Sequence, residues 1–237
     1  MAPHISTDSA AASAHSAFIT VEGVDGAGKS TQARLLAAAL KHAGNEVLAL
    51  REPGGVAISE KIRALLLDPA NAEMGDTCEL LLYEAARAQL VHQVIDPALV
   101  AGKVVVCDRF FDSTTCYQAF ADGLDRDVVA QANALAVGST VPALTLVYDI
   151  DPVAAAERRA ERGRADRMEA KGLAFQNKVA EGFRAIASEE PARVKLVDAA
   201  ASIEEVFART VAHVRAAGFE LGDGDVAAAL ATLNGAE

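Results

Sequence analysis

The sequence predicts a three-layer α/β fold, in which a parallel sheet of about five strands is covered on both faces by helices. Two observations carry this prediction. Short apolar, β-branched segments alternate along the chain with longer segments of helical character, a pattern typical of parallel sheets. The first apolar segment runs directly into a glycine-rich loop and then a helix, the order found in phosphate-binding loops. Together they indicate the P-loop NTPase fold.

The glycine-rich loop fits the pattern G-x-x-x-x-G-K-[ST] through Gly23, Gly28, Lys29 and Ser30. Glycines let the backbone expose its N–H groups to phosphates, and the following helix N-terminus adds a positive field. We expect Lys29 to reach the β- and γ-phosphates of a nucleotide and the Ser30 hydroxyl to ligate Mg²⁺. The alternative is a plain glycine-rich turn. The residues expected to contact the nucleotide are Gly23, Val24, Asp25, Gly26, Ala27, Gly28, Lys29, Ser30 and Thr31.

Composition limits the class of protein. The 237 residues are 51% hydrophobic, which suits one domain with a core of its own. No apolar run reaches the ~18 residues of a membrane span, and residues 1–16 lack the features of a signal peptide. Three unpatterned cysteines favour a reducing, cytoplasmic location. The net charge of −11 argues against a nucleic-acid partner but allows a small anionic substrate held by a few arginines.

Each remaining element has a local signal. Residues 1–16 are expected to form a flexible tail, and the domain is expected over 17–218. Gly44 ends the helix after the loop at about residue 43, and Ser202 with Glu205 forms a capping box. The Gly/Asp-rich and alanine-rich stretch 219–237 is expected to be a frayed helix or a C-terminal tail. The expected strands are 17–22, 46–50, 104–107, 144–148 and 194–197, and the other helices are 57–67, 76–100, 113–120, 125–137, one from Pro152, 172–188 and 202–216.

Polar residues stand where the second and third strands end. Arg51 follows the second strand, and Asp108 with Arg109 follows the third. Ligands of such sheets bind at the carboxyl ends of the strands, so we expect these residues to meet the glycine-rich loop at one edge. Asp108 is then expected to lie near Mg²⁺ or to position phosphates. The alternatives are a local backbone bond for Asp108 and surface ion pairs for the arginines.

A dense run of arginines follows the helix that begins at Pro152. We interpret the segment of about 162–170 as a lid that folds over a triphosphate and supplies positive charge during transfer. The alternative is a solvated helix end, where the helix dipole favours arginine. The arginines are Arg158, Arg159, Arg162, Arg164 and Arg167.

From about Phe18 to about Val214 the chain resembles the thymidylate kinase family. The matching segments are 22–31, 51–55, 83–87, 108–109 with 113–118, and 166–169. The resemblance implies phosphorylation of dTMP to dTDP with ATP, in the synthesis of dTTP, by a homodimer that uses Mg²⁺. The glycine-rich loop carries no basic residue, as in the bacterial kind, which places basic residues in the lid instead.

The resemblance also implies roles in holding the base and sugar of dTMP. Tyr83 would stack on thymine, Arg87 would contact it, and Thr114 and Gln118 would read its polar groups. Tyr117 would crowd the sugar 2′ position and so favour deoxyribose. Without the resemblance, Tyr83 and Tyr117 would be equally well read as core residues. The sequence departs from the family at position 116, where Cys replaces the usual Ala, and at position 83, where Tyr replaces the commoner Phe.

Further roles concern the phosphates. The resemblance implies that Asp25 lies near the sugar 3′-hydroxyl and the metal, while Arg51 and Arg109 hold the acceptor phosphate. Arg167 is the first choice for the lid cation, followed by Arg164 and Arg162. The expected catalytic residues are Lys29, Arg109, Arg167 and Arg164, and the expected metal ligands are Ser30 and Asp108.

Two other functions were weighed. One is a different nucleoside monophosphate kinase of the same fold. The other is a GTPase switch, which needs a D-x-x-G segment after a strand and an N-K-x-D base reader. The residues after Asp108 are Arg-Phe-Phe, and the segment 177–180 reads Asn-Lys-Val-Ala without the acid. The sequence therefore favours a kinase with ATP and dTMP as its partners.

Overall fold

The computed structural model describes residues 17–160 and 167–234 and contains one parallel five-stranded sheet. The strands lie in the order β2-β3-β1-β4-β5, and every neighbouring pair is parallel. The sheet predicted from the sequence is thereby confirmed, with each expected strand in place. The strands are β1 (Phe18–Glu22), β2 (Val47–Arg51), β3 (Val104–Asp108), β4 (Leu144–Asp149) and β5 (Val194–Asp198).

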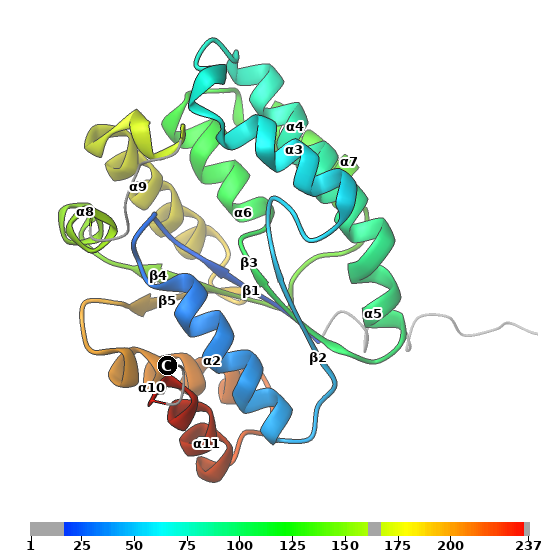
Figure 1. The fold of residues 1–237 in the computed structure, drawn as a ribbon, viewed down its shortest axis with the longest axis vertical. Coiled ribbons are helices and arrows are strands. Elements are labelled where there is room, and N and C mark those ends of the chain that lie inside the picture. Colours follow the sequence, from blue (N-terminus) through cyan, green and yellow to red (C-terminus); the bar gives the residue numbers. More distant parts are fainter. Residues whose placement is uncertain (1–16, 161–166, 235–237) are drawn as a thin grey trace, which may run out of the picture.

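Helices cover both faces of this sheet. In Figure 1, α2, α10 and α11 lie on one side of the sheet, and α3 to α7 with α9 lie on the other. A π-helical segment, Val91–Ile95, joins α4 to α5, and another, Thr115–Ala121, continues α6. The predicted helices 76–100 and 113–120 are therefore helical, but each changes from α-helical to π-helical hydrogen bonding along its length. None of the described helices is long and apolar enough to cross a membrane. The helices are α2 (Lys29–His42), α3 (Ala57–Leu67), α4 (Asp76–Leu90), α5 (Asp96–Val100), α6 (Phe111–Thr114), α7 (Arg126–Val137), α8 (Pro152–Ala160), α9 (Leu173–Glu189), α10 (Ile203–Ala216) and α11 (Asp223–Asn234), with short 3₁₀ turns at Pro69–Asn71 and Glu169–Lys171.

Strand β1 lies at the centre of the sheet and contributes to the core on both faces. Its side chains alternate, so Ile19 and Val21 pack into the larger hydrophobic cluster and Phe18 into a second one on the opposite face. Phe18 meets the ring of Phe110 edge-on, with 5.0 Å between the ring centroids. Burial on both faces explains why the strand is a continuous apolar run in the sequence.

The C-terminal stretch differs from the sequence prediction. The expectation of a tail over 219–237 is wrong for α11, which packs along α2. Ala229 is fully buried there and Leu221 nearly so. Val226, Leu230 and Leu233 pack against the same core cluster, at helical spacing. Because the segment is rich in alanine, this apolar stripe gives only a weak signal in the sequence. Its binding surface, one side of α2, is formed only in the folded chain.

The register of the strands brings the polar motifs to one edge. Asp108 at the end of β3 is paired with Val21 of β1 on one side and with Arg51 of β2 on the other. The loop that follows β1 and the turns that follow β2 and β3 therefore leave the sheet together, as the sequence predicted. The functional site is built on this edge.

Candidate active site

The glycine-rich loop joins β1 to α2 and is shaped by glycines with left-handed backbone angles. Gly26 has φ of 93°, and Gly28 caps α2 with φ of 90°. A Cβ atom on Gly23 would lie 2.6 Å from the carbonyl oxygen of Tyr148, and one on Gly26 would overlap the carbonyl oxygen of Ala155. The first turn of α2 contains no acidic residue, so no side chain of that turn opposes the positive field at this helix end.

Lys29 is the first residue of α2 and folds back over the loop. Its ammonium group donates a hydrogen bond to the carbonyl oxygen of Val24 at 2.7 Å, and the side chain is buried. Burial, reinforced by the nearby guanidinium of Arg109, lowers the pKa of Lys29 to about 8. Both effects disfavour a charged lysine, so this position is suited to a ligand that brings negative charge into the loop.

Ser30 and Asp108 place two oxygen atoms beside the loop. The Ser30 hydroxyl donates to a carboxylate oxygen of Asp108 at 2.5 Å. Hydroxyl and carboxylate oxygens suit Mg²⁺, which usually keeps waters and phosphate oxygens as its other ligands. Among the residues that the structure describes, no group of three or more His, Cys, Asp or Glu side chains could hold a metal ion. The pair fits an ion that takes its remaining ligands from water and phosphate.

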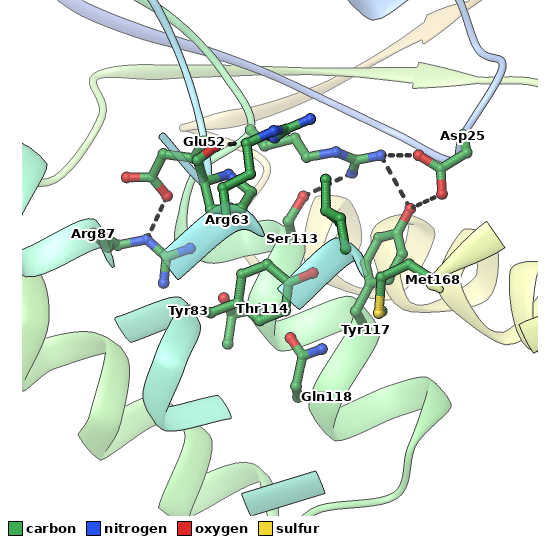
Figure 2. Close-up of a pocket in the computed structure, with 13 residues that line it drawn as sticks. Asp25, Glu52, Arg63, Tyr83, Arg87, Ser113, Thr114, Tyr117, Gln118 and Met168 are labelled. Atoms are coloured by element: carbon green, nitrogen blue, oxygen red, sulfur yellow. Dashed lines mark hydrogen bonds and ion pairs between the residues drawn. The ribbon is translucent and has the colours of Figure 1, made fainter. Parts of the chain in front are cut away.

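A cavity next to the loop, which we call the inner cavity, collects most of the predicted substrate residues (Figure 2). Seven of the eight residues predicted to bind the acceptor line it; Arg51 does not. Its side chains come from segments that are far apart in the sequence, among them the loop, α3, α4, and α6 with the π-helical segment that continues it. The lining residues are Asp25, Glu52, Pro53, Arg63, Leu67, Tyr83, Arg87, Arg109, Ser113, Thr114, Tyr117, Gln118 and Met168.

Arg109 is the centre of a network in the wall of the inner cavity. Its guanidinium pairs with the Asp25 carboxylate and donates to the Ser113 hydroxyl at 3.0 Å and to the Tyr117 hydroxyl at 3.2 Å. Tyr117 in turn donates to Asp25 at 3.2 Å. Arg109 has φ of 73°, an uncommon value for a residue other than glycine and one that recurs at functional sites. The network fixes a cation between the loop and the cavity.

Electrostatic effects keep this network charged. Burial raises the pKa of Asp25, but Arg109 and Lys29 lower it further, and the net direction is down. Beneath the network, Glu22 accepts hydrogen bonds from the Phe110 amide and the Ser113 hydroxyl, both at 2.6 Å. These bonds hold the turn that carries Arg109. Burial raises the pKa of Glu22 to about 8.

Arg87 is fixed at the wall of the inner cavity by two buried carboxylates. It donates to Glu52 at 2.8 Å and to Glu84 at 2.5 Å, and it lies over the Phe110 ring, 5.5 Å from the centroid. Burial raises the pKa of Glu52 to about 7 despite the neighbouring Arg87. The sequence analysis identified Arg87 but missed both carboxylates. Both stand in segments that carry the family resemblance, Glu52 in 51–55 and Glu84 in 83–87, and Glu84 lies three residues before Arg87, at the spacing of a helical side-chain pair.

A second cavity, which we call the loop cavity, opens over the glycine-rich loop. Arg51 lines it and pairs with Glu60 at 3.0 Å, with both side chains nearly half exposed. Two further arginines line it that the sequence analysis did not predict as site residues, Arg63 of α3 and Arg159 of α8. Nothing local separates Arg63 from a surface arginine, whereas Arg159 belongs to the arginine-rich run. The lining residues are Asp25, Gly26, Gly28, Lys29, Ser30, Thr31, Arg51, Glu52, Arg63, Asp108, Arg109 and Arg159.

Arg167, the first choice for the lid cation, lines neither cavity. It is buried, donates to the Leu66 carbonyl oxygen at 2.7 Å and pairs with Glu79 at 2.6 Å. The structure therefore holds this guanidinium away from the loop, because a buried carboxylate on α4 attracts it, which no pattern around residue 167 reveals. Arg162 and Arg164 lie outside the described residues.

A third cavity, the side cavity, extends from the loop toward the N-terminus of α10. It shares Gly26, Gly28 and Thr31 with the loop cavity, and its other lining residues include Gln32, Arg158, the turn after β5 and the first turn of α10. Arg158 donates to the carbonyl oxygen of Ala199 at 3.0 Å and so braces that turn. The sequence analysis did not predict this cavity, since its two walls are about 170 residues apart in the chain.

These three cavities define a class of protein. A phosphate-binding loop that adjoins an arginine-lined second cavity is the site of a P-loop kinase acting on a small phosphorylated acceptor. Comparisons with known proteins agree. The family model described as Thymidylate kinase matches residues 21–210. The chain is 47% identical over 194 residues to a thymidylate kinase of Geobacter sulfurreducens, covering 79% of this chain and 91% of the relative.

Two more comparisons support the same family. A thymidylate kinase of Symbiobacterium thermophilum is 49% identical over 192 residues, covering 81% of this chain and 89% of the relative. The crystal structure of thymidylate kinase from Ehrlichia chaffeensis superimposes with a TM-score of 0.69 at 32% identity, covering 84% of this chain and 97% of that one. The chain belongs to the thymidylate kinase family, whose members phosphorylate dTMP to dTDP with ATP. The resemblance found in the sequence is confirmed.

Proposed function

We propose that ATP occupies the loop and side cavities, that dTMP occupies the inner cavity, and that the phosphoryl group passes between them beside Asp25 and Arg109. One observation carries this proposal: both residues line the loop cavity and the inner cavity. The two bound phosphates then meet at a shared wall that already holds a fixed cation. The side cavity, which continues from the loop, is the proposed site of the adenine base.

The reaction at this wall requires positioning rather than a protein base. The acceptor phosphate has a second pKa near ~6, so it is largely a dianion at neutral pH and already a nucleophile. Arg109 holds that dianion, while Lys29 and the N–H groups of the loop hold the donor phosphates. Ser30 and Asp108 are the proposed ligands of Mg²⁺, which when bound would neutralise charge on the β- and γ-phosphates. The other residues from Gly23 to Thr31 are proposed to complete the binding site for the phosphates of ATP.

The inner cavity is proposed to read the base and the sugar. Tyr83, Arg87, Thr114 and Gln118 all line it, and Thr114 lies beside Tyr83 (Figure 2). Tyr117 crosses toward Asp25 where the sugar would lie, and its hydroxyl is held by Arg109 and Asp25. This position supports the proposed exclusion of a 2′-hydroxyl. Arg51, at the edge of the loop cavity, is proposed to assist with the acceptor phosphate.

The proposal for the lid cation changes with the structure. Arg159 lines the loop cavity, whereas Arg167 is paired with Glu79. We therefore expect Arg159→Ala to lower kcat by roughly 10²-fold or more, by analogy with the worth of arginine fingers, with little change in the KM for dTMP. Arg34→Ala, an exposed arginine on α2, is the control. A large loss of kcat in Arg167→Ala with none in Arg159→Ala would restore Arg167, with Arg164, as the catalytic choice.

A homodimer is proposed from a group of exposed apolar side chains on adjoining helices. Helices α3, α4 and α7 lie side by side (Figure 1), and five of their large apolar residues are more than half exposed. These residues are Ile58, Leu65, Leu81, Val128 and Leu135. Leu135→Glu should convert a dimer to a monomer in sedimentation measurements, whereas Val153→Glu on α8 should not.

The experiment that tests the function is a coupled ADP-release assay over several nucleoside monophosphates. Turnover of dTMP far above that of dUMP, UMP, AMP and GMP is expected, and a preference for AMP or GMP would contradict the assignment of the inner cavity. Lys29→Ala should lose most turnover while dTMP still binds, because the lysine meets only donor phosphates. The proposed location is the cytoplasm, where the three free cysteines stay reduced.

A further inference from the structure

Glu79 is a buried acid of α4 that lies behind the wall of the inner cavity. Its side chain is 1% exposed. One carboxylate oxygen accepts from the side-chain amide of Gln118 at 2.7 Å and from Lys171 at 3.2 Å, and the other pairs with Arg167 at 2.6 Å. Neither the sequence analysis nor the proposed function gives this residue a role. It nevertheless makes the only described hydrogen bond to the side chain of Gln118, a proposed base reader.

The chemistry of the pair decides which way the Gln118 amide faces. An ionised carboxylate has no hydrogen to donate, so the group of Gln118 that meets Glu79 must be its NH₂. The amide oxygen then points away from Glu79. Figure 2 shows that oxygen on the side of Thr114 and Tyr83, within the cavity. Among the described contacts it accepts no hydrogen bond, so it is left as an acceptor for a ligand.

The surroundings of Glu79 keep it ionised. Burial alone raises its pKa, but Lys171 and Arg167 lower it further, and the net direction is down. Lys171 is itself held by Asp122 at 2.8 Å, so its position does not depend on Glu79 alone. The carboxylate therefore stays an acceptor at neutral pH, and the orientation of the Gln118 amide is fixed before a nucleotide binds.

We propose that Glu79 is a positioning residue that holds the Gln118 amide with its oxygen toward the acceptor base, so that the cavity selects pyrimidines that carry a hydrogen on N3. The inference rests on the proposed role of Gln118 as a base reader. Thymine and uracil donate from N3–H to that oxygen. Cytosine presents a lone pair at N3, which would face the amide oxygen in a buried site with no hydrogen between them.

The fixed orientation of the Gln118 amide should be lost when Glu79 is replaced by a neutral residue. In Glu79→Gln the introduced amide can either donate or accept, so Gln118 can turn and offer its NH₂ to the N3 of cytosine. We expect the ratio of kcat/KM for dTMP to that for dCMP to fall by at least about tenfold, because wild-type discrimination would come from leaving a buried hydrogen-bonding group unpaired. The ratio for dTMP to dUMP should stay unchanged, because both bases carry N3–H.

Two further variants control for loss of folding and for loosening of the contacts of Lys171. Asp122→Asn weakens the hold on Lys171 without touching the Glu79–Gln118 bond, so both ratios should stay within about threefold of the wild type. If Glu79→Gln alone does not fold, the double variant Glu79→Gln with Lys171→Met restores the charge balance of the cluster. It should show the same loss of discrimination against dCMP.

The outcomes separate this inference from the proposed function. Gln118→Leu should also lower the dTMP to dCMP ratio, and an unchanged ratio there would show that Gln118 does not read the base. If Gln118→Leu lowers the ratio but the Glu79 variants leave it unchanged, Gln118 reads the base and the positioning role of Glu79 is wrong. Equal falls in the dCMP and dUMP ratios would show a loosened cavity and would likewise overturn the positioning role.

Discussion

Two glycines of the phosphate-binding loop form a matched pair for testing how the loop is built. Gly26 and Gly28 have nearly the same left-handed backbone, with φ of 93° and 90°. Their surroundings differ. A Cβ atom on Gly26 would overlap the carbonyl oxygen of Ala155 in α8, whereas one on Gly28 would meet no protein atom within 4 Å. Alanine at either position therefore carries the same conformational cost, and only the Gly26 variant adds a steric one.

The magnitudes follow from these two costs. A left-handed backbone costs a residue with Cβ about 1–2 kcal/mol, and forcing an extra carbon into packed structure adds about 1–3 kcal/mol. For a chain of this size each 1 kcal/mol lowers Tm by about 2–4 °C. Gly28→Ala should then melt about 2–8 °C below the wild type, and Gly26→Ala about 4–20 °C below it.

Thermal unfolding without nucleotide, followed by titration with ADP, distinguishes the two effects. Gly28 lines the loop cavity, so its added carbon lies in the space proposed for phosphates. We expect Gly28→Ala to fold well but to lose the rise in Tm that ADP gives the wild type. Gly26→Ala should show its main defect before ADP is added. Equal melting temperatures for the two variants without nucleotide would refute the steric argument for Gly26.

Three other predictions use the same measurements. Tyr117→Ala should narrow the gap in kcat/KM between dTMP and its ribose analogue, and an unchanged ratio would exclude the 2′ role. The raised pKa of Glu22, about 8 against 4.5, means that folding takes up a proton, so Tm should fall as pH rises from 5 to 8, and Glu52, with a pKa of about 7, contributes to the same fall below pH 7. Glu22→Gln should reduce the fall, most clearly between pH 7 and 8, and parallel curves would show that another group is responsible. Ending the chain at Gly218 should lower Tm by more than about 5 °C, because α11 and its buried Ala229 are lost from α2, whereas removing residues 1–16 should change Tm little; equal effects would mean that α11 adds no stability.

The sequence alone predicted the fold and the part of the site around the phosphate-binding loop. The phosphate-binding loop requires a fixed spacing of glycines and lysine, and buried parallel strands require continuous apolar runs, so both are written in neighbouring residues. The rule that ligands bind at the carboxyl ends of strands then predicts Arg51, Asp108 and Arg109 beside the loop. The register of β1, β2 and β3 bears this out.

The tertiary structure decided what depends on distant partners. Arg63 and Arg167 are both arginines within helical or turn segments, yet one lines the cavities and the other is paired with Glu79. The difference arises because α3 places Arg63 beside the cavities, whereas α4 places the buried Glu79 within reach of Arg167. Helix α11 is likewise defined by the side of α2 that it covers. A charge or an apolar stripe in the sequence states what a segment can bind, but its partner is chosen by packing, because burial and ion pairing depend on groups that only the folded chain brings together.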